Sequence, residues 1–339
     1  MGRANYMTFP GNTSLDYAVL HLLLESQGRT LSWAGIAGGA GITVEHAKGI
    51  VGSLIDHGFN MITAGEAGCA ISEGHDVLSV PGIYRQLNTR ALGRQIQYAF
   101  TTASTNDDAK VMAPSCPDGT LVICETQTKG KGRLGRQWES PRGGVFMSVI
   151  LKPEITPAEV PPLALAAGYA VAKALEGQGL NPSVKWPNDV LVDGKKLAGI
   201  LCELGAGQGQ VEHVIVGVGI NANISADHMP QEVRKRSTSI SDKLGKPVDR
   251  SSLIARVLNE FEPLYHRFLE SGIEPLIPLI QPSLAYVGEQ VMIHNTALGS
   301  DESYYGVLQG LDRDGSILLR TLTGEIWRFA AGDLSLRPK

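Results

Sequence analysis

The sequence predicts an α+β protein of three parts, and three observations predict it. Residues 12–80 carry apolar side chains at helical spacing, residues 120–221 are dominated by strand-like runs, and residues 284–339 hold only short alternating runs. At 339 residues the chain is also long for one hydrophobic core. We therefore expect separate domains over residues 12–80, 86–283 and 284–339.

The first part has three helical segments, residues 15–26, 31–42 and 43–58. Gly41 lies between the second and third, where a helix-turn-helix needs a tight turn. The stretch 59–80 contains several glycines and is typical of a small β-wing. We expect an N-terminal winged helix-turn-helix, although a compact helical domain with another purpose would show the same pattern.

The second part opens with a polar stretch after Pro81 and Gly82, "YRQLNTRALGRQ", which is typical of a linker. Strand-like runs then cover residues 120–127, 144–153, 197–204 and 211–221. A helix over residues 162–175 has a single apolar face, and a second helix over 253–269 is expected to bend at Pro263. This combination predicts an α+β domain with a mixed or antiparallel sheet.

The third part is expected to be a small all-β module. Its short alternating runs are separated by the turn sequences "DRDG" and "TGE". About five strands in about 55 residues predict a barrel resembling an SH3 domain.

Composition excludes several classes of protein. The formal net charge is −4, so no global basic field attracts nucleic acid, and such a partner has to meet a local patch. No apolar run approaches the roughly 18 residues of a membrane span, and the start lacks the apolar core of a signal peptide. We expect a cytoplasmic protein without membrane contact. Its four cysteines lack C-x-x-C spacing and are expected to be free thiols.

The stretch of residues 130–144, "GKGRLGRQWESPRGG", begins with the glycine pattern G-x-G-x-x-G of a dinucleotide-binding turn. A Rossmann turn needs a helix that opens at the third glycine, and Pro141 with the pair Gly143-Gly144 prevents one. The stretch is therefore a long loop between strands. Its cations alternate with glycines, so backbone donors and charged side chains can wrap a polyanion together, although a solvated basic loop is the alternative. These cations are Lys129, Lys131, Arg133 and Arg136.

Three further clusters in the second part are "STND" from Ser104, "KWPNDVLVDGKKLAGIL" from Lys185 and "GVGINAN" from Gly217. Because Pro187 prevents a helix, Asn188 and Asp189 are expected on a turn between strands. Lys196 follows at the mouth of an apolar strand, where a partly desolvated ammonium can meet a carboxylate or phosphoryl oxygen. A plain surface lysine in a hairpin is the alternative.

Together these residues predict a ligand with two acidic parts and an apolar part. Arg133, Arg136 and Lys196 supply positive charge. Asp189 supplies a carboxylate for a magnesium ion or a hydroxyl, and Trp138 supplies a flat surface. No catalytic serine or cysteine with a histidine partner accompanies them. We therefore expect electrostatic phosphoryl chemistry without an enzyme nucleophile, such as activation of a carboxylic acid by ATP.

The motifs "GKGRLGRQW", "KWPNDV", "KKLAGIL", "STN" and "GVGIN", between a helix-turn-helix and a small β-barrel, closely resemble the bifunctional biotin protein ligases that also serve as biotin operon repressors. The resemblance covers nearly the whole chain. It implies formation of biotinyl-5′-adenylate from biotin and ATP with Mg²⁺, and transfer to a lysine of the biotin carboxyl carrier domain of a carboxylase such as acetyl-CoA carboxylase. It also implies a central domain similar to class II aminoacyl-tRNA synthetases and a homodimer that forms on adenylate binding and binds operator DNA.

The resemblance also implies roles for individual residues. The residues expected around the biotin ring are Ser104, Thr105, Asn106 and Gln127. Those expected to close over biotin and its adenylate are Lys131, Gly132 and Arg133. Those expected to contact ATP or adenylate are Gly130, Arg136, Trp138, Lys185, Asn188, Asp189 and Asn221, with Asp189 the candidate magnesium ligand. Lys196 is expected to hold the biotin carboxylate and then the acyl phosphate, and with Arg133 it forms the expected catalytic pair.

Two departures from the family pattern bear on function. Lys131 stands where many members have arginine, so the charge is kept and the bidentate fork is lost. Residues 1–85 carry four Lys+Arg (Arg3, Arg29, Lys48, Arg85) against seven Asp+Glu (Asp16, Glu25, Glu45, Asp56, Glu66, Glu73, Asp76). A repressor needs cations for phosphate contacts, so this unit can have a helix-turn-helix fold while its DNA binding is weak or lost, and operator DNA stays a possible partner. The expected DNA-contacting residues are Thr43, His46 and Lys48.

Two other functions stay open from the sequence. A ligand-sensing transcription factor would bind biotin or its adenylate without transferring the biotinyl group. A lipoate ligase would run the same adenylate chemistry on a related fold, although the loop "GKGRLGRQW" favours biotin.

Overall fold

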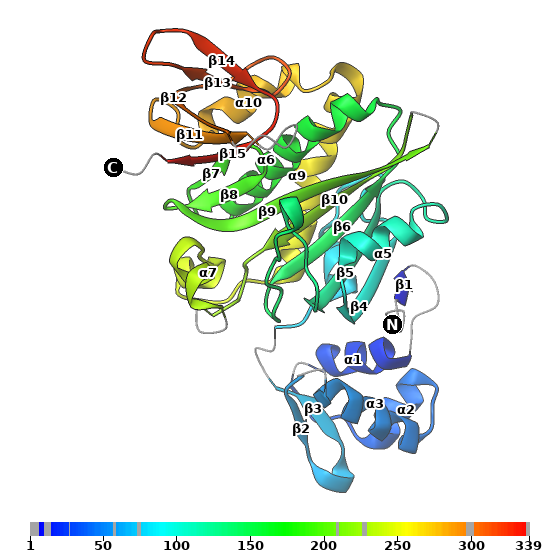
Figure 1. The fold of residues 1–339 in the computed structure, drawn as a ribbon. Helices are drawn as coiled ribbons and strands as arrows, with labels where there is room; N and C mark the ends of the chain where they lie inside the picture. Colours follow the sequence, from blue (N-terminus) through cyan, green and yellow to red (C-terminus); the bar gives the residue numbers. More distant parts are fainter. Residues whose placement is uncertain are drawn as a thin grey trace.

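The structure is a computed structural model that describes residues 7–9, 15–26, 28–56, 59–72, 76–207, 210–225, 229–295 and 302–336. Figure 1 shows three bodies in a row: a small helical body at one end, a large sheet with its helices in the middle, and a smaller sheet at the other end. The expected domain boundaries stay predictions, and the expected start at residue 12 falls outside the described residues.

The N-terminal unit (residues 15–72) holds α1 (Leu15–Glu25), α2 (Trp33–Ala40) and α3 (Val44–Asp56), followed by the antiparallel pair β2 (Met61–Thr63) and β3 (Cys69–Ile71). Ser32 begins α2 by accepting a hydrogen bond from the Gly35 N–H. Gly41 ends α2 with a φ of 67°, a left-handed conformation that favours glycine. The turn that the sequence predicts between α2 and α3 is therefore present.

The central sheet has eight strands in the order β1-β4-β5-β6-β10-β9-β8-β7. Their bounds are β1 (Met7–Phe9), β4 (Ile96–Thr102), β5 (Thr120–Gln127), β6 (Val145–Leu151), β7 (Pro182–Lys185), β8 (Asp189–Val192), β9 (Lys195–Gly207) and β10 (Gln210–Ile220). Strands β4 and β5 run parallel and the other neighbours run antiparallel, so the mixed sheet that the sequence allowed is confirmed.

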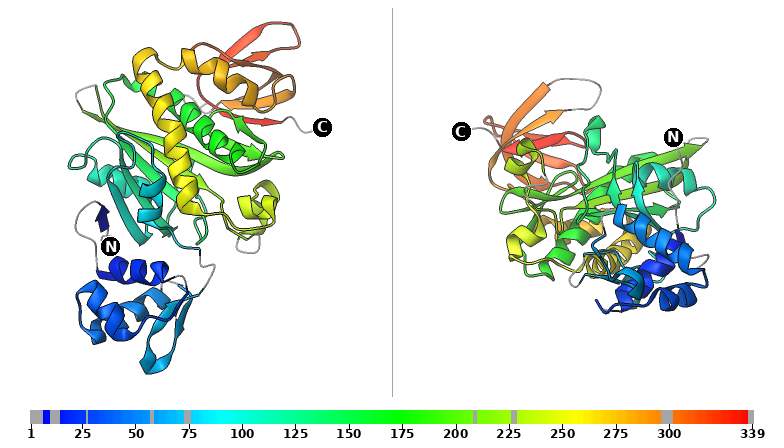
Figure 2. Two further views of the ribbon diagram at one scale, coloured as in Figure 1. Left: turned by 180° about the vertical axis from the view of Figure 1, so that it is seen from behind. Right: turned by 90° about the horizontal axis from the view of Figure 1, so that it is seen from below.

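Helices cover both faces of this sheet. The crossover between the parallel strands β4 and β5 is α5 (Thr105–Met112), which packs on β5, β6 and β10. The opposite face is covered by α6 (Val160–Glu176) and α9 (Arg250–Ser271), which also pack on each other (Figure 2). The apolar face predicted for α6 is buried, and its alanines let α9 approach closely. Helix α9 continues through Pro263 as one element.

The C-terminal sheet has five antiparallel strands in the order β14-β13-β12-β11-β15. Their bounds are β11 (Gln290–Asn295), β12 (Glu302–Leu311), β13 (Ile317–Arg320), β14 (Ile326–Phe329) and β15 (Asp333–Leu336). The buried Trp186, between β7 and β8, donates from its indole N–H to the Gly315 carbonyl at 3.1 Å. This contact ties the C-terminal sheet to the strand turn that carries Lys185 and Asn188.

Short helices fill the connections: α4 (Val80–Gln86), α7 (Gln231–Arg236), α8 (Ile240–Leu244) and α10 (Ile277–Ile280). The linker predicted from Pro81 to residue 95 is wrong for residues 81–86, which belong to α4, whereas residues 87–95 form no helix or strand. Ser79 caps α4, and Pro81 lies in its first turn, where proline costs no hydrogen bond.

Within the part of the chain that the structure describes, no helix has the length and apolarity needed to cross a bilayer. All four cysteines are free, as expected.

Candidate active site

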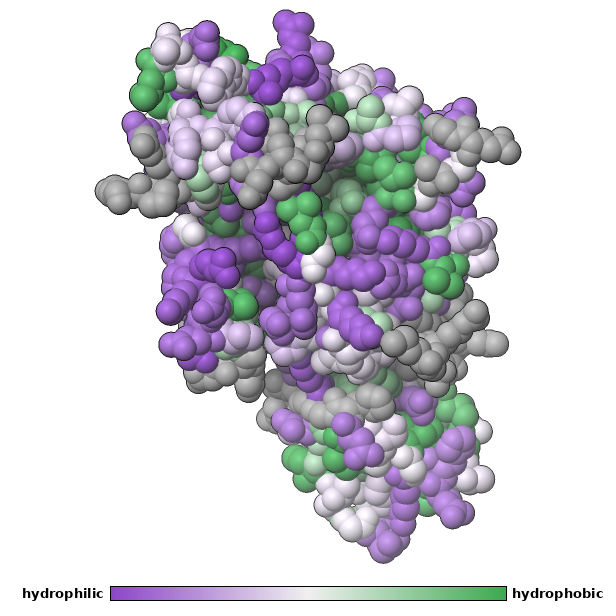
Figure 3. All heavy atoms as spheres, in the orientation of Figure 1, coloured by the Kyte–Doolittle hydropathy of each residue, from purple (hydrophilic) through white to green (hydrophobic). Residues whose placement is uncertain are grey.

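A cavity of about 380 Å³ opens between the central and C-terminal sheets. Its walls come from the start of α5, the loop between β5 and β6, the β7–β8 turn, β9, β10 and β15. Hydrophilic side chains gather over the middle of this face of the molecule (Figure 3). The sequence-predicted residues that line the cavity are Ser104, Thr105, Asn106, Gln127, Lys131, Gly132, Arg133, Arg136, Trp138, Lys185, Asn188, Asp189 and Lys196.

Two predicted residues, Gly130 and Asn221, are not among the lining residues. A Cβ on Gly130 would lie 2.4 Å from the Trp138 carbonyl oxygen, so glycine lets the loop fold back on itself. Asn221 is buried and donates to the Thr238 carbonyl at 3.1 Å, which holds the chain after α7 against the sheet. Both residues therefore act on the shape of the site in this structure.

The charged centre of the cavity is Asp189 with two lysines. Lys196 Nζ lies 2.6 Å from Asp189 Oδ1, and Lys185 Nζ lies 4.0 Å from Asp189 Oδ2. The pKa of the Lys185 ammonium is lowered, chiefly because the group is buried. The charge of Asp189 raises this pKa and the charge of Lys196 lowers it further. The site thus concentrates positive charge around one carboxylate. Lys196, for which a plain surface position in a hairpin was the alternative, lines the cavity.

Trp138 forms the flat wall that the sequence predicts. Lys196 Nζ lies 5.1 Å from its ring centroid. Glycines on the neighbouring strands make room for the ring, because a Cβ on Gly199 or Gly219 would lie 2.9 Å or 2.6 Å from Trp138 atoms. The glycines of β9 and β10 therefore let the Trp138 ring lie close to these strands, and the ring is the surface on which a planar group can stack.

The polar end of the cavity is a connected hydrogen-bond network. Gln127 Oε1 accepts from the Thr105 N–H at 2.9 Å, and Gln127 Nε2 donates to Ser140 Oγ at 2.8 Å. Ser148 donates to Asn106 Oδ1 at 2.6 Å, and its Oγ lies 2.8 Å from Thr105 Oγ1. Because these side chains hold one another, their remaining donors and acceptors are fixed in direction before a ligand arrives.

The ligand loop (residues 128–144) is held at its tip from two sides. Lys131 Nζ lies 2.5 Å from Asp107 Oδ1 on α5. Arg133 Nη1 lies 3.2 Å from Asp333 Oδ1 on β15 and 3.3 Å from Asn188 Oδ1, and Arg136 also pairs with Asp333. Three of the four loop cations, Lys131, Arg133 and Arg136, thus line the cavity, although Lys131 and Arg136 are also exposed to solvent. Lys129 is exposed and is not among the lining residues.

Residues 98–221 match the model of the biotin/lipoate A/B protein ligase family. The chain is 34% identical over 273 residues to the bifunctional ligase/repressor BirA of Bacillus subtilis, which covers 78% of this chain and 82% of that protein. The chain belongs to the biotin protein ligase family. It is also 31% identical over 228 residues to the biotin–[acetyl-CoA-carboxylase] ligase of Paracoccus denitrificans, covering 66% of this chain and 93% of that one.

Solved structures of biotin protein ligases share the fold. The biotin protein ligase from Aquifex aeolicus in complex with biotin and ATP superimposes with a TM-score of 0.62 and 31% identity, over 72% of this chain and 99% of that chain. The Rossmann interpretation of the glycine pattern is therefore excluded on two grounds, the family and the strand-to-strand course of the ligand loop.

Sequence reasoning missed several residues of this ligase site. Ser148 has a local signal, because it is a polar residue inside an apolar strand and is buried. Glu203 also has one, since it follows "LAGILC"; it accepts from Asn106 Nδ2 at 2.8 Å and pairs with Lys110. Asp107 and Asp333 carry no such signal, because acidic residues are ordinary at a helix start or in a turn.

The expected DNA-contacting residues of the ligase lie on α3 or just before it. Thr43 caps α3 by accepting from the His46 N–H at 3.2 Å, and His46 is exposed. Lys48 Nζ lies 2.9 Å from Glu66 Oε2 and 5.6 Å from the Trp33 ring centroid. The lysine of α3 is thus already paired with a carboxylate of the same unit.

Metal ligands are sparse. Among the described residues, no group of three or more His, Cys, Asp or Glu side chains is placed to hold a metal ion. Asp189 offers one carboxylate in the cavity, which suits Mg²⁺, since this ion commonly takes one carboxylate together with substrate phosphates and water.

Proposed function

We propose that this chain activates biotin with ATP to biotinyl-5′-adenylate and transfers the biotinyl group to a lysine of a biotin carboxyl carrier domain. The observation that carries the proposal is the cavity itself: a prearranged polar end, a flat aromatic wall and a cluster of cations meet in one space. Membership of the biotin protein ligase family supports the same reaction.

The proposed binding mode follows the polarity of the cavity. The ureido ring of biotin has two N–H donors and one carbonyl, which suit the network of Ser104, Thr105, Asn106 and Gln127. Its apolar chain then runs towards Lys196, which meets the carboxylate. Adenine lies against Trp138, and the phosphates meet Arg133, Arg136 and Lys185. Asn188, Asp189 and Asn221 support the nucleotide side of the site.

In the first step, a carboxylate oxygen of biotin attacks the α-phosphorus of ATP, and the bond to the β-phosphate oxygen breaks with release of pyrophosphate. Lys196 orients the carboxylate and then neutralises charge that grows on the acyl phosphate. Arg133 neutralises charge on the phosphate side. No enzyme side chain forms a covalent bond in this scheme.

In the second step, the neutral amine of a carrier lysine attacks the acyl carbon, AMP leaves with the bonding electrons, and the amine loses a proton. Closure of the ligand loop keeps water away from the mixed anhydride until the carrier arrives. Mg²⁺, when bound, would neutralise phosphate charge, and Asp189 is the residue that would hold it.

The finer features of the fold belong to the same proposal. The N-terminal unit is a winged helix-turn-helix (12–80), the central part (86–283) resembles class II aminoacyl-tRNA synthetases, and the C-terminal sheet (284–339) is SH3-like. The relatives named bifunctional ligase/repressor support operator binding. The proposal further includes a homodimer that forms with adenylate, and a cytoplasmic location. The acidic balance of the N-terminal unit limits the affinity for DNA.

A streptavidin blot tests the ligase proposal. The full chain is incubated with biotin, ATP, Mg²⁺ and the carrier domain of acetyl-CoA carboxylase, with a carrier whose acceptor lysine is replaced by arginine as the control. Biotin on the intact carrier alone is the expected result. A folded chain that binds biotin and leaves the carrier unlabelled would be the ligand-sensing regulator instead, and preferential transfer of lipoate in direct competition would make it a lipoate ligase.

A further inference from the structure

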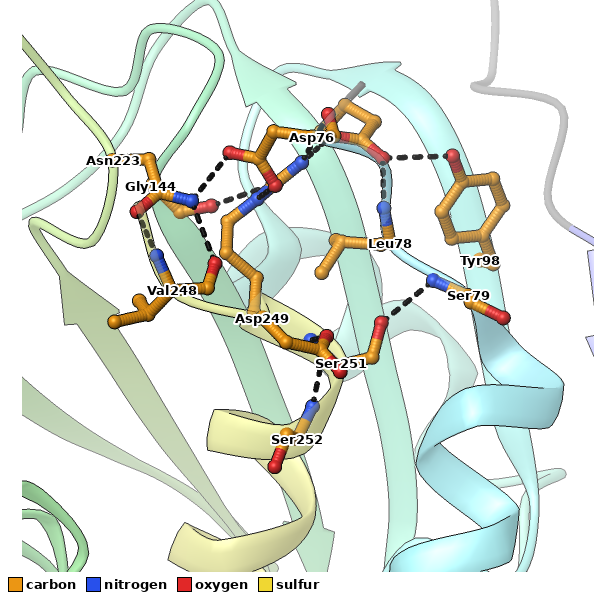
Figure 4. Close-up of polar contacts among 12 residues, drawn as sticks. Asp76, Leu78, Ser79, Tyr98, Gly144, Asn223, Val248, Asp249, Ser251 and Ser252 are labelled. Atoms are coloured by element: carbon orange, nitrogen blue, oxygen red, sulfur yellow. Dashed lines mark hydrogen bonds and ion pairs between the residues drawn. The ribbon is translucent and has the colours of Figure 1, made fainter. Parts of the chain in front are cut away.

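A cluster of buried charges lies outside the cavity, where α9 begins (Figure 4). Arg250, the first residue of α9, is 1% exposed. It donates from Nε to Asp76 Oδ1 at 2.5 Å, from Nη2 to Glu125 Oε2 at 2.7 Å and from Nη1 to the Gly144 carbonyl at 2.9 Å. Burial alone would lower the pKa of Arg250, but Glu125 and Asp76 outweigh it and raise the pKa, so the residue stays a cation.

The partners of Arg250 come from three different places. Asp76 lies in the segment that leads out of the N-terminal unit towards α4. Glu125 lies on β5, two residues before Gln127 of the polar network. Gly144 is the last residue of the ligand loop. One buried side chain therefore joins the N-terminal unit, the strand behind the cavity and the base of the ligand loop.

The base of the ligand loop has further contacts in the same region. The Gly143 carbonyl accepts from the Asn223 N–H at 2.7 Å, and Asn223 Nδ2 donates to Asp76 Oδ2 at 2.8 Å. The Arg142 guanidinium lies 4.0 Å from the ring centroid of Phe59 in the N-terminal unit, and Phe59 packs edge-on against Phe100 of β4. Three successive loop residues thus contact either the N-terminal unit or a residue whose side chain binds its exit segment.

The exit segment is itself fixed. The Leu78 N–H donates to Glu125 Oε1 at 2.8 Å, and the Val80 N–H donates to the Tyr17 hydroxyl at 2.7 Å. Tyr17 is 1% exposed and packs edge-on against Tyr98 of β4. The N-terminal unit is therefore seated on the central sheet by buried contacts and is not a freely tethered module.

A buried ion cluster is a costly way to gain stability, because desolvation cancels much of the attraction between its charges. A buried guanidinium can instead fix geometry, because its donors point in set directions and so hold the groups that accept from them in fixed relative positions. Here the acceptors are the exit segment, β5 and the loop base.

We propose that Arg250 is a positioning residue for the ligase reaction, which holds the base of the ligand loop through Gly144, and that Asp76 holds Arg250 in place. This inference rests on the proposed function.

The test compares two variants of the full chain. Asp76→Ala removes the carboxylate that accepts from Arg250 Nε and from Asn223 Nδ2. It leaves the backbone carbonyl of residue 76, Glu125 and Gly144 as acceptors for Arg250. Asn259→Ala is the control, because Asn259 also lies on α9 and holds the segment after α4 through Asn88 and Gln86, without touching the cluster. Michaelis constants for biotin, kcat, and hydrogen exchange of residues 128–144 with biotin and ATP bound are measured for each.

Asp76→Ala is expected to raise the KM for biotin about tenfold, to leave kcat within about twofold, and to speed exchange in the ligand loop. Asn259→Ala is expected to change neither the KM nor the exchange of the loop. If Asp76→Ala does not unfold cooperatively, Asp76→Asn, which keeps the size and one acceptor oxygen, carries the same comparison with a smaller expected change in KM.

Two results would overturn the inference: an unchanged KM and unchanged loop exchange in the folded Asp76 variant, or equal changes in both variants. A wild-type chain that fails to label the carrier would instead overturn the proposed function, so the two failures are distinguishable.

Discussion

Asp333 Oδ1, on the last strand of the C-terminal sheet, lies 3.2 Å from Nη1 of Arg133, which precedes it by 200 residues in the chain. The same carboxylate pairs with Arg136. The C-terminal sheet thereby holds the tip of the ligand loop, while the region around Arg250 holds its base. A loop fixed at both ends can trap a reactive intermediate without a large rearrangement.

Replacing Asp333 with alanine should let biotinyl-adenylate escape. Because the carboxylate is partly exposed, we expect a loss of about 1 kcal/mol, or about a fivefold faster release of adenylate. Asp312→Ala is the matched control, since Asp312 pairs with Arg328 of the same sheet and is not among the residues that line the cavity. Release is measured by rapid dilution into excess unlabelled biotin and ATP. Equal release rates in the two variants would mean that Asp333 does not hold the loop.

Replacing Arg133 with glycine should have a larger effect of the same kind. Free adenylate is a mixed anhydride and would acylate exposed lysines without selectivity. Mass spectrometry of bystander proteins measures this, and labelling confined to the carrier lysine would refute the role of Arg133.

The alkaline pH dependence of ATP binding should follow Lys185. Its pKa is lowered by burial, so this ammonium loses its proton at a lower pH than an ordinary lysine. As the pH rises through that value, the charge that meets phosphate is lost and the KM for ATP should rise. Pyrophosphate exchange from about pH 7 to about pH 10 measures it. Lys185→Arg stays protonated and should remove the rise; an identical profile in that variant would exclude Lys185 as its cause.

Glu262 on α9 should contribute to stability in a pH-dependent way. Burial opposes its ionisation, but backbone N–H donors of Leu92, Ala91 and Arg90 outweigh this and lower its pKa. Its contribution is therefore present above the unfolded-state pKa and is lost as the pH falls through the lower folded-state pKa.

Glu262→Gln should lower the free energy of unfolding by about 1–3 kcal/mol at neutral pH, and the difference from wild type should shrink in acid. Glu260→Gln is the control and should change the free energy of unfolding little, because Glu260 is exposed two residues earlier on the same helix. Urea unfolding at several pH values gives both numbers. A deficit that does not depend on pH would show that the carboxylate charge is not what matters.

The affinity of the chain for DNA should depend only weakly on salt concentration. Each neutralised phosphate adds about 0.9 to the slope of log affinity against log salt, and Lys48 is already paired with Glu66. Glu66→Gln should free Lys48 and steepen the slope, measured by fluorescence anisotropy on the chain's own promoter with adenylate present. Tight binding by the ligand-free chain with a steep slope would contradict this account of the charge pattern.

Many of the residues that line the cavity belong to local motifs that the sequence analysis singled out. "STN", the glycine-and-cation loop and "KWPND" each place several side chains at once, because a short turn fixes their relative positions. The mixed sheet followed from apolar runs too short for helices. Because of Pro81, residues 81–86 were predicted to be part of a linker, but proline is also favoured in the first turn of a helix, as it is in α4.

The rest depends on tertiary placement. Asp333 and Asp76 look like ordinary surface carboxylates in the sequence, and only the packing of distant elements brings them to Arg133 and Arg250. The three-residue strand β1 likewise has no periodicity to detect, and its pairing with β4 is a property of the sheet edge.

The measurement that tests the central claim most directly is exchange of labelled pyrophosphate into ATP, dependent on biotin, by wild type, Lys196→Met and Lys195→Met. Lys195 is the neighbouring exposed lysine on β9 and serves as the matched control. We predict full exchange by wild type and Lys195→Met, and background exchange by a folded Lys196→Met, because the ammonium that orients the carboxylate is gone. Near-wild-type exchange by Lys196→Met would contradict the proposed mechanism.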